Sequence, residues 1–475
     1  MNTGDSHTMT FRLSALCLSV AAAAISMPAA AKTPWPAAAA QTLDLARKAI
    51  ALRSVEGEGN KTPEVDDLFR NALVAGGWDP ADIRIVPLGD TAYMIATWPG
   101  SDPSLSPLVI SGHLDVVEAD PADWERDPFT PVVENGFLFG RGSSDMKFSA
   151  ALAVSALIQM RKDGWKPRRT IVVAFSGDEE TSMKTSAIIA KELKGADLVI
   201  NIDGGGGTFD ETTGKPLFWN FDGAEKTYND YTLAVTNPGG HSSMPRPDNA
   251  IVQMATALDR IGAYRFPTEL NAVTKTYFEN AAKFEPDAKI AGAMRAFAAN
   301  PHDEQAIATL SVEPGIVGKL GTTCVPTMVS GGHALNALPQ SVTANINCRI
   351  FPGHTREEIR KDLERVVDMP VVTVTDATGD ASIASPASPM RPDFLAAAKK
   401  AMGKAWPGVP VFPVQASGAS DNMWFRAQGI DSYGASPIFI KDSDDFAHGL
   451  NERVPLSNIE PGLTYYMTLI PELAK

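Results

Sequence analysis

The sequence predicts an α/β protein with a mostly parallel central sheet flanked by helices, interrupted by a smaller α+β domain. The chain has 475 residues, which is long for a single hydrophobic core. Short continuous apolar runs alternate with helical patterns in its first half, as is typical of buried parallel strands. After Asp203 the pattern changes to strands with alternating polar and apolar residues, which are typical of a half-exposed sheet.

The N-terminal segment has the order of a secretory signal peptide. Arg12 precedes an apolar run over residues 13–27, and small residues follow up to Ala31. The run is shorter than the roughly 20 residues that span a bilayer, although a membrane anchor or a tail is the alternative. We therefore expect cleavage of residues 1–31, no membrane span in the mature chain, and a secreted or periplasmic protein.

The next part of the chain predicts the α/β domain. Apolar runs of strand length alternate with segments of helical periodicity. The predicted elements are a strand at 107–111, a helix at 148–160, a strand at 169–176, a helix at 185–193 and a strand at 196–202.

The middle of the chain predicts an inserted α+β lid domain. The glycines of 204–207 form a flexible stretch before it. The predicted elements are a strand at 231–236, a helix at 249–261, a polar, mostly helical segment at 267–310, a strand at 342–350 and a helix at 355–366. The tail, with a helix at 391–403, then returns to the first domain. The expected boundaries are 32–224 and 385–475 for the α/β domain and 225–384 for the inserted lid domain.

Composition narrows the class of partner. The formal net charge is −14, and the chain lacks long basic runs. Nucleic acids and anionic membranes both attract clusters of Lys and Arg, so neither is an expected partner. Outside the signal the cysteines are Cys324 and Cys348, which could form a disulfide in an oxidising compartment or remain free thiols.

Acidic and histidine side chains follow the predicted strands. In an open α/β sheet the carboxyl ends of the strands share one edge, so these side chains can converge there. The candidates are His113 and Asp115 after the first strand, Asp145 in a glycine-rich loop, Glu179 and Glu180 after the second strand, Asp203 after the third, and His448 near the C-terminus.

These residue types suit a two-metal hydrolytic site. Two divalent ions need a bridging carboxylate with His or carboxylate ligands at each end, and such ligands without thiolates fit catalytic zinc. One of the adjacent Glu179 and Glu180 can bind metal while the other accepts a proton from water. Asp115 can orient the imidazole of His113 from outside the metal's own ligand set.

The chain also resembles a known metallopeptidase family. This family comprises dipeptidases, aminoacylases, succinyl-diaminopimelate desuccinylases and glutamate carboxypeptidases. The matching motifs occur in the family's order over nearly all of the mature chain: SGHLDVV at 111–117, GFLFGRGSSDMK at 136–147, GDEE at 177–180, GGHSS at 239–243, NALP at 336–339 and HGLNER at 448–453.

The resemblance implies a role for each matching residue. His113 and Asp203 would hold one metal, Glu180 and His448 the other, and Asp145 would bridge them, with a cis peptide bond after it. The cofactor would be two Zn²⁺, or another divalent ion such as Co²⁺ or Mn²⁺. The remaining roles are Glu179 as general base, Asp115 as the orienting residue, His241 of the lid domain as the group that polarises the scissile carbonyl, and Asn336, Arg349, Gly418 and Ser420 as substrate contacts.

The predicted function is hydrolysis of the amide bond of dipeptides or short peptides. Asp at position 203 resembles the dipeptidase branch, so a dipeptidase is favoured over an N-acyl-amino-acid amidohydrolase or a carboxypeptidase. A non-catalytic binding protein on the same fold is a remote alternative, because every expected ligand position is filled. The resemblance also implies a possible homodimer through the lid domain. His241 would then reach over the active site of its own chain or over that of the partner.

Overall fold

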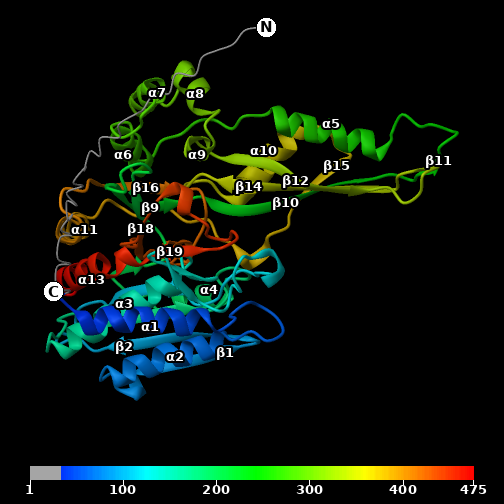
Figure 1. The fold of residues 1–475 in the computed structure, drawn as a ribbon. Helices are drawn as coiled ribbons and strands as arrows, with labels where there is room; N and C mark the ends of the chain where they lie inside the picture. Colours follow the sequence, from blue (N-terminus) through cyan, green and yellow to red (C-terminus); the bar gives the residue numbers. More distant parts are fainter. Residues whose placement is uncertain (1–33) are drawn as a thin grey trace, which may run out of the picture. The chain divides into compact units, whose positions relative to one another are not determined.

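A ten-stranded mixed sheet forms the centre of the structure (Figure 1). The structure is a computed structural model that describes residues 34–475. The predicted signal at 1–31 lies outside them. The strand order is β1-β2-β6-β3-β7-β17-β9-β8-β18, and β16 pairs with β9. The bounds are β1 Ile83–Leu88, β2 Thr91–Trp98, β3 Leu108–His113, β6 Ile171–Ser176, β7 Leu198–Asn201, β8 Gly206–Phe209, β9 Pro216–Glu225, β16 Val411–Ala416, β17 Asp431–Gly434 and β18 Phe439–Ile440.

The middle of this sheet is parallel and buried on both faces. Strands β6, β3, β7 and β17 pair in parallel. In β3, Ile110 packs into one apolar cluster with α3, whereas Val109 packs into another with Ile189 of α4. Helices on both faces explain why these strands are continuous apolar runs. The flanking helices are α1 Pro36–Ile50, α2 Thr62–Ala75, α3 Lys147–Lys162, α4 Lys184–Glu192, α11 Pro392–Ala405, α12 Asn422–Ala427 and α13 Ile459–Leu473.

A separate antiparallel sheet has the order β12-β14-β10-β15. Alternate residues of β10 and β14 are buried under two helices, as the alternating sequence pattern predicts. Cys324 and Cys348 face each other on β12 and β14 and form a disulfide. The elements are β10 Thr227–Thr236, α5 Ala250–Ala263, β12 Thr323–Gly331, β14 Ser341–Ile350, α10 Arg356–Val367 and β15 Val372–Asp376, with the short pair β11 Gly240–His241 and β13 Ala337–Leu338.

The helical segment between α5 and β12 packs on the large sheet. Phe278 and Phe297 of this segment form an apolar cluster with Phe412 of β16. The helices are α6 Ala272–Ala281, α7 Ala288–Ala299, α8 Glu304–Leu310 and α9 Pro314–Val317. Polar residues occupy the other faces of these helices. The segment therefore has helical periodicity although its composition is mostly polar.

The structure confirms the predicted fold class: a mixed sheet with a parallel centre flanked by helices, with a smaller antiparallel sheet beside it. A further small sheet of β4 Val132–Glu134, β5 Phe137–Phe139 and β19 Arg453–Pro455 joins two loops that are far apart in the chain. Within residues 34–475, no helix combines the length and apolar character needed to cross a membrane.

Candidate metal centre

The predicted acidic and histidine residues meet at the carboxyl edge of the parallel strands. His113 ends β3, and Asp203 follows β7, the neighbour of β3. Glu179 and Glu180 follow β6, the neighbour of β3 on the other side. Asp145 lies just before α3, and the Asp145–Met146 peptide bond is cis, as the family resemblance implies.

Asp145 faces a different imidazole with each of its two carboxylate oxygens. Its Oδ1 lies 3.0 Å from Nε2 of His113, and its Oδ2 lies 3.1 Å from Nε2 of His448. The same nitrogen of His113 is 3.5 Å from Asp203, and that of His448 is 2.9 Å from Glu180. One atom each from His113, Asp145 and Glu180 lies within 4.8 Å of the others. The five residues thus form two groups joined by Asp145.

Asp115 holds both glutamates through its carboxylate and contacts His113 through its backbone carbonyl. It accepts hydrogen bonds from the backbone N–H groups of Glu179 at 3.1 Å and Glu180 at 3.0 Å. Nδ1 of His113 lies 3.1 Å from the carbonyl oxygen of Asp115. The sequence interpretation assigned Asp115 only to His113, whereas the structure shows that it also holds the loop that carries the acidic pair.

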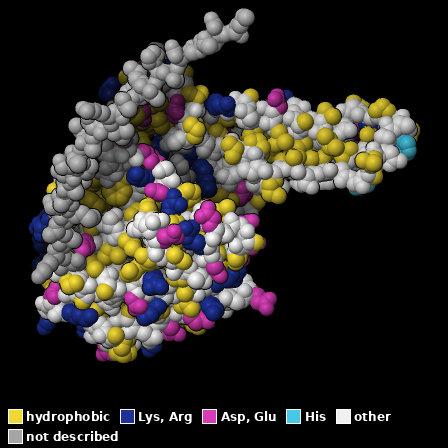
Figure 2. Space-filling view, viewed as in Figure 1, with side chains coloured by type: hydrophobic (Ala, Val, Ile, Leu, Met, Phe, Trp, Pro, Cys, Tyr) yellow, Lys and Arg dark blue, Asp and Glu magenta, His cyan; other side chains and the backbone are white. Residues whose placement is uncertain are grey.

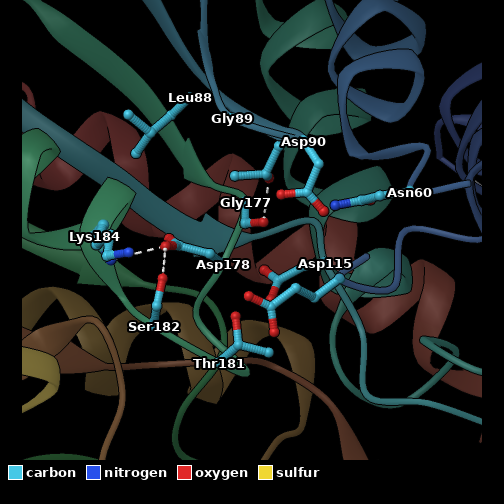
Figure 3. A pocket seen from close by; sticks show the side chains of 12 residues that line it. Asn60, Leu88, Gly89, Asp90, Asp115, Gly177, Asp178, Thr181, Ser182 and Lys184 are labelled. Carbon is cyan, nitrogen blue, oxygen red and sulfur yellow. Dashed lines mark hydrogen bonds between the residues drawn. The ribbon is translucent and has the colours of Figure 1, made fainter. Parts of the chain in front are cut away.

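Asp178 is a second residue that holds this loop, and the sequence interpretation gave it no role. It accepts hydrogen bonds from the hydroxyl of Ser182 at 2.6 Å and from the backbone N–H of Lys184 at 2.8 Å (Figure 3). Asp178 and Asp115 both line a cavity of about 300 Å³. Asp178 belongs to the GDEE motif at 177–180, so this motif could have identified the residue from the sequence.

Burial and hydrogen bonds shift the pKa values of the clustered side chains. Burial opposes ionisation of Asp145, but hydrogen bonds to His113 and His448 hold its pKa well below the ordinary value. Hydrogen bonds to Asp145 and then Glu180 raise the pKa of His448 to about 10. Burial raises the pKa of Glu179 well above its ordinary value, and His113 opposes that rise. In this cluster, burial disfavours the ionised form of the carboxylates and neighbouring positive charge favours it.

The donor set fits a pair of divalent ions. Among residues 34–475, no Lys or Arg forms an ion pair with Asp145, Glu180 or Asp203; their partners are imidazoles. Imidazole and carboxylate donors suit zinc and similar ions, and one carboxylate shared between two groups is the arrangement that two adjacent ions need.

Two cavities adjoin this cluster. One, of about 370 Å³, is lined by Glu179, Asp145 and His448 together with Tyr228 and Arg349. The guanidinium of Arg349 lies 4.7 Å from the ring centre of Tyr228. The structure thus brings Arg349 to the candidate metal centre.

The second cavity, of about 480 Å³, lies on the glycine-rich side and shares Asp145 and Asp203 with the first. Gly418 and Ser420 line it, and the Ser420 hydroxyl donates to the buried carboxylate of Glu225 at 2.6 Å. The structure therefore also places these two predicted residues beside the candidate metal centre.

His241 and Asn336 lie elsewhere in this structure. His241 is exposed on β11, pairs with Ala337 of β13, and its Nδ1 lies 2.8 Å from the hydroxyl of Ser243. The carbonyl of Asn336 accepts from Ser242 at 2.9 Å. Neither residue lines the two cavities at the candidate metal centre. Figure 1 shows β11 at the end of the smaller sheet that is remote from β9.

Known proteins resemble this chain over most of its length. The profile described as Peptidase family M20/M25/M40 matches residues 109–472. The chain is 28% identical over 386 residues to N-fatty-acyl-amino acid synthase/hydrolase PM20D1 of Xenopus tropicalis. The matched region covers 78% of this chain and 73% of that protein.

Two solved structures share the fold. The M20 family metallo-carboxypeptidase Sso-CP2 of Sulfolobus solfataricus has a TM-score of 0.69 and 16% identity, covering 91% of this chain and 99% of that one. The di-peptidase Dug1p of Saccharomyces cerevisiae has a TM-score of 0.63 and 19% identity, covering 92% and 96%.

Proposed function

Because the chain belongs to peptidase family M20/M25/M40 and is a hydrolase, we propose that it is an exported two-metal peptidase that hydrolyses dipeptides or short peptides. The observation that carries this proposal is Asp145, whose two carboxylate oxygens face two separate histidine–carboxylate groups. A carboxylate shared between two such groups is the arrangement that two adjacent ions need.

Each ion would have its own ligands. His113 and Asp203 would hold one ion, Glu180 and His448 the other, and Asp145 would contact both. When bound, a divalent pair supplies a water of lowered pKa and a Lewis acid for the scissile carbonyl. We propose zinc, since the ligands are imidazole and carboxylate, although Co²⁺ or Mn²⁺ suits the same donors.

Glu179 would serve as the general base. It is 8% exposed, lines the cavity beside Asp145, and makes no ion pair with either imidazole of the cluster within the described residues. Its carboxylate can therefore accept a proton from the attacking water and deliver it to the leaving amine. Asp115 accepts hydrogen bonds from the backbone N–H groups of both Glu179 and Glu180. It would thereby hold the backbone so that the two side chains point in different directions.

Arg349 would bind the carboxylate end of the substrate. Its side chain lines the cavity of Glu179 and lies over the ring of Tyr228. A guanidinium can bind a carboxylate through two parallel hydrogen bonds. Gly418 and Ser420 would contact the other side of the substrate from the second cavity.

The inserted region 225–384 would act as a lid and as the contact of a homodimer. Strand β12 is the edge of its sheet, and apolar side chains of β12 and the adjacent α5 are exposed. Their exposed fractions are 50% for Ile251, 60% for Val252, 54% for Val325, 72% for Met328 and 64% for Val329. Figure 2 shows hydrophobic side chains gathered over these elements. Such a patch is typical of a protein contact. In this dimer His241 and Asn336 would reach the partner's substrate.

A second candidate function is hydrolysis of N-acyl amino acids. The similarity to an N-fatty-acyl-amino acid synthase/hydrolase favours it. Both substrate classes have an amide bond beside a terminal carboxylate, so Arg349 and the metal pair would act on either in the same way.

The test is an assay of metal-depleted and reconstituted protein. Chelation should abolish activity, and Zn²⁺, Co²⁺ or Mn²⁺ should restore it at two ions per chain. A panel of free dipeptides beside N-acetyl and N-fatty-acyl amino acids then separates the two candidates. Full activity in protein verified to be metal-free would contradict the two-metal proposal, and turnover of only the acylated substrates would replace the dipeptidase by the second candidate.

A further inference from the structure

The side chain of Glu452 receives hydrogen bonds from four donors. It is fully buried and lies directly before β19. Its Oε1 accepts the backbone N–H groups of Ser144 at 2.6 Å and Asp145 at 3.0 Å. Its Oε2 accepts the backbone N–H of Gly142 at 3.0 Å and the guanidinium of Arg141 at 2.7 Å. The whole loop that ends at Asp145 is therefore bound to this one carboxylate.

The backbone joins the same two segments. Arg453 of β19 pairs with Phe139 of β5, and the N–H of Gly140 donates to the carbonyl of Glu452 at 3.0 Å. The guanidinium of Arg141 also donates to the carbonyl of Gly449 at 3.2 Å. Gly449 follows His448 in sequence. The loop that carries Asp145 is thus bound to the loop that carries His448.

We infer that Glu452 is a positioning residue that holds Asp145 in place relative to His448. It lines neither cavity at the metal centre, so it would contact neither substrate nor ion. The inference rests on the proposed two-metal function. Because Asp145 would contact both ions, a displacement of its loop changes both sites at once. Residues that orient metal ligands in this way typically change metal affinity when they are replaced.

The four donors require a carboxylate. Two donate to each oxygen, and a carboxylate oxygen can accept two hydrogen bonds. A glutamine at this position presents one oxygen and one NH₂ group, so in either orientation two of the four N–H donors would face another donor. The isosteric substitution Glu452→Gln therefore removes half of the hydrogen bonds without changing the side-chain volume.

The experiment is a metal titration of full-length Glu452→Gln, Glu452→Asp and wild-type protein. Zinc binding is measured by competition with a chromophoric chelator, and Co²⁺ absorption spectra report the ligand geometry. We expect Glu452→Gln to weaken zinc binding by about 10- to 100-fold and to alter the Co²⁺ spectrum. Glu452→Asp keeps both oxygens and the charge, so it should recover part of the affinity.

Asn458→Ala is the matched control. Asn458 is also fully buried and makes three hydrogen bonds, to Phe439 N–H at 2.8 Å and to the carbonyls of Phe439 at 2.8 Å and Pro455 at 3.1 Å. We expect Asn458→Ala to lower the unfolding temperature of the metal-free protein while leaving zinc affinity and the Co²⁺ spectrum unchanged.

The outcomes separate the two proposals. If both Glu452 variants have a lower unfolding temperature but wild-type zinc affinity and Co²⁺ spectrum, Glu452 only stabilises the fold and the inference is wrong. If Glu452→Gln does not fold, Glu452→Asp and Arg141→Lys decide the question by the same two measurements, with wild-type values in both again contradicting the inference. If the wild-type protein takes up fewer than two ions, the proposed function fails instead.

Discussion

Nε2 of His448 lies 3.1 Å from Oδ2 of Asp145, although these residues come from distant parts of the chain. His448 has a left-handed backbone conformation, with φ of 60°, and its loop leads into β19. The loop that ends at Asp145 follows β5, the antiparallel partner of β19. This pairing completes a cluster that the parallel strands supply only in part.

Replacing the two adjacent glutamates should have different effects. Glu180 lies 2.9 Å from Nε2 of His448, so Glu180→Ala should lower metal occupancy. Glu179 lines the cavity and forms no ion pair with either imidazole within residues 34–475, so Glu179→Ala should retain metal while turnover falls by about 10²- to 10⁴-fold. Metal analysis and steady-state kinetics on both variants measure this. Equal loss of metal in both would show that the roles are not divided in this way.

Metal uptake should become tighter as the pH rises. In the metal-free protein, hydrogen bonds to Asp145 and Glu180 raise the pKa of His448 to about 10, so His448 is protonated at neutral pH. An ion that binds there must displace this proton, so the affinity should rise about tenfold per pH unit below pH 10 from this group alone. Zinc competition titrations between pH 6 and 8 measure the slope. His241→Asn should keep the slope, whereas affinity independent of pH would contradict the prediction.

Replacing Arg349 should affect substrates through their carboxylate. Arg349→Met should lower kcat/KM by about 10- to 100-fold, since a hydrogen bond to a charged group contributes about 1.5–3 kcal/mol. Amidation of the substrate carboxylate should have a large effect on the wild-type enzyme and little on the variant. Arg365→Met is the control, because Arg365 pairs with Asp362 on α10. A variant that still discriminates between acid and amide would remove Arg349 from carboxylate binding.

His241 should act in the partner's site. His241→Ala should retain metal and lower turnover by about 10²- to 10³-fold, as expected for loss of one donor to the oxyanion. Mixing the impaired His241→Ala and Glu179→Ala proteins should restore part of the activity, because mixed dimers contain one intact site. Met328→Asp, at an exposed apolar position of β12, should reduce both dimer formation and this complementation. Mixtures with no recovered activity would indicate that closure occurs within one chain.

The proposed export predicts a mature protein that begins near Lys32. Residues 13–27 are apolar and end before small residues, which is the pattern of a cleaved signal. N-terminal sequencing or intact mass of protein recovered from outside the cytoplasm measures this. Retention of residues 1–31 would overturn both the cleavage site and the proposed localisation.

The sequence by itself was sufficient for the fold class and for the convergence of the candidate metal-binding residues. Parallel strands buried on both faces must be apolar throughout, so runs such as 169–176 were recognisable without a structure. The carboxyl ends of β3, β6 and β7 must share one edge, so the proximity of His113, Glu180 and Asp203 followed from their positions alone.

Only the tertiary structure decided the features that depend on contacts distant in sequence. Cys324 and Cys348 form a disulfide because β12 and β14 pair in a register that places them opposite each other. The hydrogen bonds from the loop at Asp145 to Glu452 exist because β19 pairs with β5. Such pairings result from strand register and from the packing of the whole chain, whereas sequence periodicity reports only which face of a local segment is buried.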